Sequence, residues 1–138
     1  MSILLIIHSI TRWLVVFVAL ALVGRLLLGL INSRPFDKSA GVLVAAFGGL
    51  MDVQMLLGLL LFLLGGFGGL GFPAYRWEHA VLMLLAVIMA HVPAWWKKSP
   101  DEVRTRNTLI MVILSLVLVF LGVGPLGWTR WLHITGLF

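Results

Sequence analysis

Long apolar runs separated by short polar segments make up most of the chain. The first run extends from Ile3 to Ile31 and is interrupted only by His8, Arg12 and Arg25. A helix needs about 20 predominantly apolar residues to cross the hydrocarbon core of a bilayer, and this run exceeds that length. A removable signal peptide would begin with basic residues and have a shorter apolar stretch. We therefore expect a membrane-spanning helix over about residues 3–31.

Three further runs have the same character. They predict helices over about residues 41–64, 77–95 and 108–123. The glycine-rich segment 65–69, which follows the second run, is expected to be too flexible to hold a helix. The last segment, residues 127–138, is too short to cross a bilayer again, and its tryptophans and arginine predict an interfacial position.

The composition is typical of a membrane protein and not of a soluble one. Of the 138 residues, 62% are hydrophobic and 11% are charged, which is far from the average for soluble domains. Four consecutive spans with short connections pack most simply in antiparallel order. The predicted fold class is therefore all-α, an integral membrane four-helix up-down bundle, with residues 1–138 as a single transmembrane domain.

Basic residues are concentrated around two of the predicted connections. The formal net charge is +5, and most of the basic residues flank the first and third connections: Arg25, Arg34, Lys38, Lys97, Lys98, Arg104 and Arg106. Because cytoplasmic loops carry the excess of Lys and Arg, both termini are predicted to face outward, which in a bacterium is the periplasm. The predicted location is the bacterial inner (cytoplasmic) membrane, crossed several times, and no nucleic-acid partner is expected.

The chain contains no cysteine. This excludes disulfides, thiolate-held iron–sulfur clusters, cysteine-ligated zinc and thioether-linked haem. Any metal must therefore be held by His, Asp, Glu or Met. The methionines are scattered along the chain and none is paired with a histidine, so methionine ligation has little support.

Ionisable residues inside a membrane are costly, which makes them candidates for function. His8 in the first predicted helix and His79 at the start of the third are expected at similar depth near the outer face. Two imidazoles at one height in a helical bundle can provide both axial ligands of a haem iron. The alternative is that each histidine reaches toward interfacial water or makes one polar contact.

Two other histidines fit this arrangement less well. His91 follows His79 by twelve residues, which places it about 18 Å deeper along a helix, and no other histidine is predicted at that level. A second bis-histidine haem within the chain is therefore not supported, and His91 is expected to bond helix-end carbonyls or water. His133 lies in the tail, where it either replaces one of the candidate ligands or, as we prefer, faces solvent.

Two charged residues are predicted near the middle of the membrane on neighbouring helices. Arg12 follows His8 by one helical turn, and Asp52 lies about 15 Å from the inner boundary, so an Arg12–Asp52 ion pair is plausible. Arg12 could anchor a haem propionate or a quinone carbonyl, and Asp52 could pass a proton. The alternative is a structural clasp between the two helices. Gln54 is expected to point away from Asp52 and to bond another helix.

These motifs together resemble a group of small four-helix bacterial membrane proteins labelled cytochrome B. The resemblance spans nearly the whole chain and is carried by His8-Ser9-Ile10-Thr11-Arg12-Trp13, Gln54-Met55-Leu56-Leu57-Gly58-Leu59, Trp77-Glu78-His79, His91 and Arg34-Pro35-Phe36. It implies b-type haem held by His8 and His79, with Arg12 and His91 as secondary members. The segment Gly65–Gly71 and the tail with His133 look less like that group.

The preferred hypothesis is a small b-type-cytochrome-like subunit with an electron-transfer or accessory role in a respiratory or photosynthetic membrane complex. It would be a non-catalytic subunit more than an enzyme, with haem b as cofactor and quinone as a further candidate. Its expected partners are the lipid bilayer and a larger membrane complex or further copies of itself. The main alternative is a haem-free structural subunit that fills a lipid- or quinone-lined groove. A proton-path component using Arg12 and Asp52 is a third, weaker alternative.

Overall fold

The computed structural model describes residues 2–131, and its regular secondary structure over that range is entirely helical. The four long helices are α1 (Ser2–Ile31), α2 (Lys38–Gly65), α3 (Ala74–His91) and α4 (Asp101–Val123). Short helical segments extend three of them: a π-helical turn at Gly66–Leu70 and 3-10 turns at Val92–Trp96, Gly124–Leu126 and Trp128–Trp131. The predictions for residues 132–138, including His133, lie outside the described residues.

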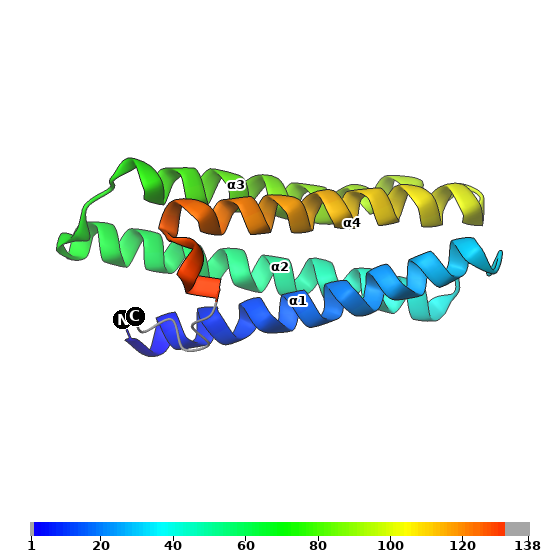
Figure 1. Ribbon diagram of the computed structural model, residues 1–138, viewed down its shortest axis with the longest axis horizontal. Helices are drawn as coiled ribbons and strands as arrows, with labels where there is room; N and C mark the ends of the chain where they lie inside the picture. The colour runs from blue at the N-terminus through cyan, green and yellow to red at the C-terminus, as the bar shows by residue number, and fades with distance from the viewer. Residues whose placement is uncertain (1, 132–138) are drawn as a thin grey trace.

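The helices form an up-down bundle in which consecutive helices run antiparallel (Figure 1). Helix α1 packs against α2 and α4, and α3 packs against the same two helices, so α1 and α3 face each other diagonally across the bundle. All four helices are long and apolar enough to cross a membrane. The predicted four-helix bundle is thus confirmed, while the direction in which it would cross remains a prediction.

The bundle has two chemically different ends. The terminal end contains the start of α1, the α2–α3 connection and the end of α4, and the loop end contains the α1–α2 and α3–α4 connections (Figure 1). At the loop end, α2 begins at Lys38 because Asp37 caps it: the Asp37 carboxylate accepts hydrogen bonds from the Ala40 N–H (3.0 Å) and the Ser39 hydroxyl (2.7 Å). Arg25 of α1 pairs with the same carboxylate at 2.9 Å. These bonds hold the pKa of Asp37 well below its usual range.

The structure corrects two predicted helix boundaries. The segment 65–69 is not free of helix: α2 continues through a π-helical turn and breaks only where Gly69 (φ 105°) and Gly71 (φ 65°) adopt the left-handed backbone that glycine tolerates. Helix α4 begins at Asp101, seven residues before the predicted start. Its first turn carries Asp101 and Glu102, whose negative charges favour a helix N-terminus.

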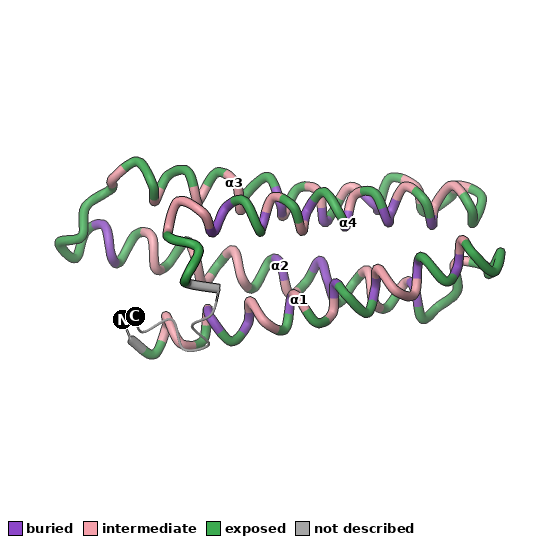
Figure 2. Tube along the Cα trace, in the orientation of Figure 1, coloured by how far each residue is buried: buried purple, intermediate pink, exposed green. Residues whose placement is uncertain are grey.

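The core is a narrow apolar seam along the bundle axis. Val15, Ala19, Leu22 and Leu26 recur at helical spacing on the inner face of α1 and are almost wholly buried. Figure 2 shows buried positions along the inner faces and exposed ones outside. The outer faces carry many large exposed apolar side chains, as a lipid-facing surface does.

One buried polar bond joins α3 and α4. The Ser115 hydroxyl donates to the Ala86 carbonyl at 2.8 Å, and both residues are fully buried. The small Ala86 side chain brings the two helix backbones close, which is the usual means of helix association in membranes. This contact holds α3 in register with α4 between the two ends of the bundle.

Candidate functional site

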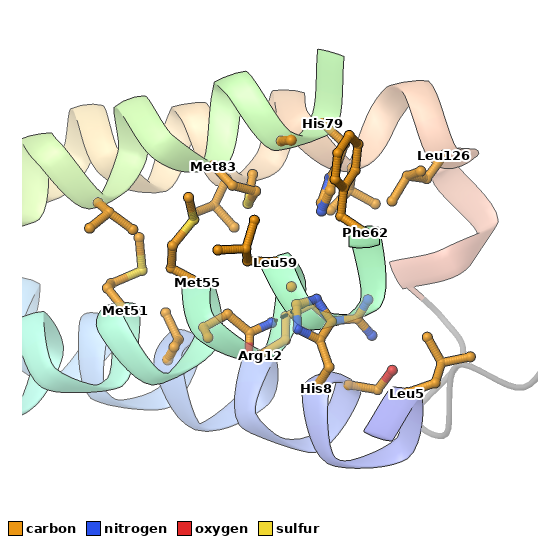
Figure 3. Close-up of a pocket in the computed structure, with 18 residues that line it drawn as sticks. Leu5, His8, Arg12, Met51, Met55, Leu59, Phe62, His79, Met83 and Leu126 are labelled. Carbon is orange, nitrogen blue, oxygen red and sulfur yellow. Dashed lines mark hydrogen bonds between the residues drawn. The ribbon is translucent and has the colours of Figure 1, made fainter. Parts of the chain in front are cut away.

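A cavity of about 140 Å³ lies inside the bundle toward the terminal end, and we call it the terminal cavity. All four helices line it, and most of the lining is apolar. Figure 3 shows the lining side chains. Its polar members are few and come from three helices: His8, Ser9 and Arg12 of α1, Gln54 of α2 and His79 of α3. The structure thus places the two predicted ligand histidines in one cavity, on the diagonal pair of helices.

His8 is held against α2 by two contacts. Its Nε2 lies 3.2 Å from Gln54 Nε2, so the amide donates and the imidazole accepts. Its ring also lies so close to Gly58 that a Cβ there would be 3.2 Å from His8 Cε1. Gln54 therefore bonds another helix, as predicted, and Gly58 leaves the space that the imidazole occupies.

Two atoms of this contact are buried without a hydrogen-bond partner among the described residues: His8 Nδ1 and Gln54 Oε1. Burying such atoms unpaired costs about 1–3 kcal/mol each. Turning the Gln54 amide over would let Oε1 accept from His8 Nε2–H and would leave a lone pair on Nδ1. With the amide donating, His8 Nδ1 carries the ring proton and cannot bind a metal. Only the turned amide leaves Nδ1 with a lone pair that a metal could take, so the turned orientation is the one that suits a binding site.

His79 is oriented by the backbone of α4. Its Nδ1 lies 2.6 Å from the Gly122 carbonyl oxygen. Because a carbonyl only accepts, Nδ1 must carry the proton, and the neutral ring then has its lone pair on Nε2. A histidine whose second nitrogen donates to a carbonyl is the usual arrangement for a metal ligand, since the bond fixes both tautomer and ring direction.

Arg12 and Asp52 do not form the predicted pair. Asp52 Oδ1 lies 2.8 Å from His91 Nε2 instead. Arg12 lines the terminal cavity with His8, and its guanidinium carbon lies 5.7 Å from the Trp13 ring centre. Helix geometry explains why Asp52 pairs with His91 and not with Arg12, because residues two apart on α2 point to different sides. Gln54 faces α1 and the cavity, whereas Asp52 faces α3.

His91 also differs from its prediction. It ends the regular part of α3, but its ring binds the Asp52 side chain of α2 and not a helix-end carbonyl. A Cβ on Gly48 would be 3.3 Å from His91 Cε1. His8 and His91 thus each lie against a glycine of α2, His8 toward the terminal end and His91 toward the loop end.

Methionines are the part of the cavity that the sequence interpretation missed. Met51 and Met55 of α2 and Met83 of α3 line it together with the two histidines. The signal was present as helical spacing: Met55 follows Met51 by four residues and Met83 follows His79 by four, and residues four apart share a helix face. Three of the six methionines are therefore gathered in space, although they are scattered along the chain.

The donor atoms that line the terminal cavity suit haem. The volume of the cavity is smaller than haem requires. Two imidazoles, an unsatisfied ring nitrogen and an apolar lining match a bis-histidine site. Its volume of about 140 Å³ is below the roughly 300–1,000 Å³ of ordinary ligand sites. Figure 3 shows Met55, Leu59 and Met83 in the space between α1 and α3. These long side chains would have to turn aside to admit a tetrapyrrole.

No family model, curated protein or solved structure matches this chain. Among residues 2–131, no group of three or more His, Asp or Glu side chains is arranged to hold a metal ion. The fold and the site together define a four-helix candidate membrane protein with a histidine-lined internal cavity.

Proposed function

We propose that the protein is a small b-type-cytochrome-like subunit that carries electrons in a membrane complex. The observation that carries this proposal is that His8 and His79, on diagonal helices, line one internal cavity. Diagonal helices face each other across the bundle axis, so a flat ligand between them would be held from both sides. The bound haem would supply one-electron redox chemistry, and the chain itself would act as a scaffold more than as an enzyme.

The chain's own residues have distinct tasks in this proposal. His8 and His79 would hold the haem iron. The Gly122 carbonyl fixes the direction of the His79 ring, and Gln54 fixes that of His8. Arg12, a cation in the same apolar cavity, would bind a haem propionate by a charge-assisted hydrogen bond. The apolar lining excludes water, which affects the redox potential of the bound group.

The proposal also includes the orientation of the chain in the membrane and its association with other proteins. The basic residues of the loop end favour a cytoplasmic position for that end of the bundle, which places the cavity near the periplasmic face of a bacterial inner membrane. With one haem on one side, the chain alone would not carry electrons across the bilayer. Its many exposed apolar side chains allow lateral association with a larger respiratory or photosynthetic complex or with further copies.

The test is a reduced-minus-oxidised visible spectrum of the full chain purified after expression with haem supply. We expect the α band of a b-type haem at about one haem per chain. His8→Ala and His79→Ala should each remove most of the band, because each deletes an axial ligand.

His91→Ala is the matched control, since His91 binds Asp52 outside the cavity. It should leave the band unchanged. A wild-type chain without the band, or a band that survives both cavity substitutions, would contradict the proposal. In that case the haem-free structural subunit becomes the preferred function, provided that assembly of the partner complex suffers without the chain.

A second candidate is favoured by the methionines. Three thioethers and two imidazoles line a cavity of about 140 Å³, and such soft ligands select Cu(I). A single ion needs less space than a tetrapyrrole, so this function requires no opening of the bundle. Metal analysis separates the two candidates: copper bound by the wild type and lost in Met83→Leu, with no haem band, would support the copper site over the haem site.

A further inference from the structure

A groove between α2 and α3 lies on the loop-end side of the terminal cavity. It has a volume of about 430 Å³, which is within the range of ordinary ligand sites. We call it the α2–α3 groove. Its polar and charged lining consists of Asp52, His91, Lys97, Arg104 and Thr108, and none of these residues lines the terminal cavity.

The Asp52–His91 pair lies in this groove at an unusual depth. Asp52 is fourteen residues after the start of α2, about 21 Å along the axis, and therefore near the middle of a span of 33 residues. Both side chains of the pair are 51% exposed. Polar side chains within a bilayer are normally buried in protein or face water. A half-exposed pair at mid-span would otherwise face hydrocarbon, so we expect a polar group of another molecule to cover it.

Thr108 of α4 provides an independent indication of a ligand. The residue is 1% exposed, it lines the groove, and its hydroxyl oxygen is buried without a hydrogen-bond partner among the described residues. A buried helical threonine ordinarily bonds a carbonyl of the preceding turn. The unsatisfied hydroxyl therefore has both a donor and a lone pair to offer to a molecule in the groove.

We infer that the α2–α3 groove binds the ring of a lipid-soluble quinone, with His91 and Thr108 as its hydrogen-bonding residues. A quinone ring is flat, apolar on its faces and polar at two opposite oxygens. Gly49 leaves open space on the α2 side of the groove, because a Cβ there would meet nothing within 4 Å, and this lets a flat ring approach. The proposal concerns a site separate from the terminal cavity and does not require that haem be bound there.

The Asp52–His91 pair suits both redox forms of this ligand. His91 Nε2 lies 2.8 Å from the Asp52 carboxylate, so the neutral ring donates there and has its lone pair on Nδ1, which accepts from a quinol hydroxyl. The protonated ring donates from Nδ1 to a quinone carbonyl. The Thr108 hydroxyl can likewise donate or accept.

A phospholipid headgroup fits the groove less well, although Lys97 and Arg104 line part of it. Those two cations lie toward the loop end, where headgroups are expected. Asp52 lies near mid-span, where a phosphate would meet a carboxylate and hydrocarbon instead of water. The Arg104 guanidinium carbon is, in addition, 3.8 Å from the centre of the Phe36 ring, a contact that already engages this cation.

Photo-crosslinking tests the inference directly. The full chain in phosphatidylcholine nanodiscs is illuminated with an azido-benzoquinone that bears a decyl tail, and the labelled peptides are identified by mass spectrometry. We expect saturable labelling of the segments around Gly49 and His91, removed by excess decyl-benzoquinone. Labelling at low probe concentration should fall about two- to tenfold in Thr108→Val and in His91→Phe, as expected for the loss of one hydrogen bond.

Ser115→Ala is the matched control, because it removes a buried hydroxyl of α4 that does not line the groove. Its labelling should equal that of the wild type. Labelling that excess decyl-benzoquinone does not remove, that phosphatidylglycerol removes equally well, or that is unchanged in both groove variants would overturn the inference. Groove labelling in a preparation without a haem band would sustain this inference while the haem proposal fails.

Discussion

Two histidines of this bundle lie against glycines of the same helix, yet their surroundings are opposite. His8 contacts Gly58 in the terminal cavity, and His91 contacts Gly48 in the α2–α3 groove. The partner of His8 is a neutral amide, whereas the partner of His91 is a carboxylate. A partly buried imidazole with a neutral partner is suited to hold a metal or cofactor. A half-exposed imidazole with a carboxylate is suited to exchange hydrogen bonds with a mobile ligand.

The comparison also shows how one helix serves two sites. Gly48 and Gly58 are ten residues apart on α2, about 15 Å along its axis. Their directions differ enough that α1 contributes the histidine at one end and α3 contributes it at the other. Substitutions at the two sites should therefore have separate effects.

The largest effect is expected from Gln54→Leu. This substitution removes the only hydrogen bond that His8 makes to another described residue, and outer partners of this kind are worth about 10–100-fold in metal affinity. Haem retention during dilution or competition with apo-myoglobin should fall by about that factor. Quinone labelling of the groove should not change, and a change there would break the separation of the two sites.

Exchanging the two glycines one at a time sharpens the comparison further. Gly58→Ala would place a Cβ 3.2 Å from His8, and crowding of this kind costs about 1 kcal/mol or more, or about fivefold in haem retention. Gly48→Ala presses on His91 instead and should lower quinone labelling alone. Gly24→Ala is the control, because a Cβ there meets nothing within 4 Å. Equal loss of haem in both crowded variants would contradict the prediction.

A smaller effect is expected at the contact that lies between the two sites. Ser115→Ala deletes the hydroxyl that bonds the Ala86 carbonyl, and such bonds in membrane helices average about 0.6 kcal/mol. The free energy of unfolding in mixed micelles should fall by about that amount, with the haem spectrum preserved. A loss of several kcal/mol would contradict this prediction, because it would mean that Ser115 stabilises the α3–α4 contact by much more than one hydrogen bond.

The smallest effect concerns pH at the loop end. Because the folded pKa of Asp37 is depressed by its Ala40, Ser39 and Arg25 bonds, its stabilising contribution is complete above the unfolded value of about 4. It is lost as the pH falls further toward the folded value. The melting temperature of the wild type should therefore drop slightly more between pH 6 and pH 3 than that of Asp37→Asn. Parallel curves for the two proteins would contradict this.

The helical architecture could be predicted from the sequence because its signals are local. Apolar runs long enough to span a bilayer define α1 to α4, and the bundle follows from their short connections. The early start of α4 was missed because Asp101–Asn107 is polar, although its first turn carries the acidic residues that favour a helix N-terminus.

The candidate site was predictable only in part. Depth along each helix could be counted, so the common level of His8 and His79 was accessible. The facing direction of each residue depends on how the helices are rotated about their own axes, which packing decides. For this reason the pairing of Asp52 with His91 instead of Arg12 was not foreseen, nor was the gathering of Met51, Met55 and Met83 around the cavity.

The central claim is that His8 and His79 hold one and the same haem iron. Low-temperature electron paramagnetic resonance of the oxidised protein measures this directly, because two imidazole ligands give a low-spin ferric signal. The wild type should be low-spin, and any haem retained by His8→Ala or His79→Ala should be high-spin, with exogenous imidazole restoring the low-spin signal. A wild-type haem that is high-spin, or a low-spin signal that survives in either variant without added imidazole, would contradict the claim.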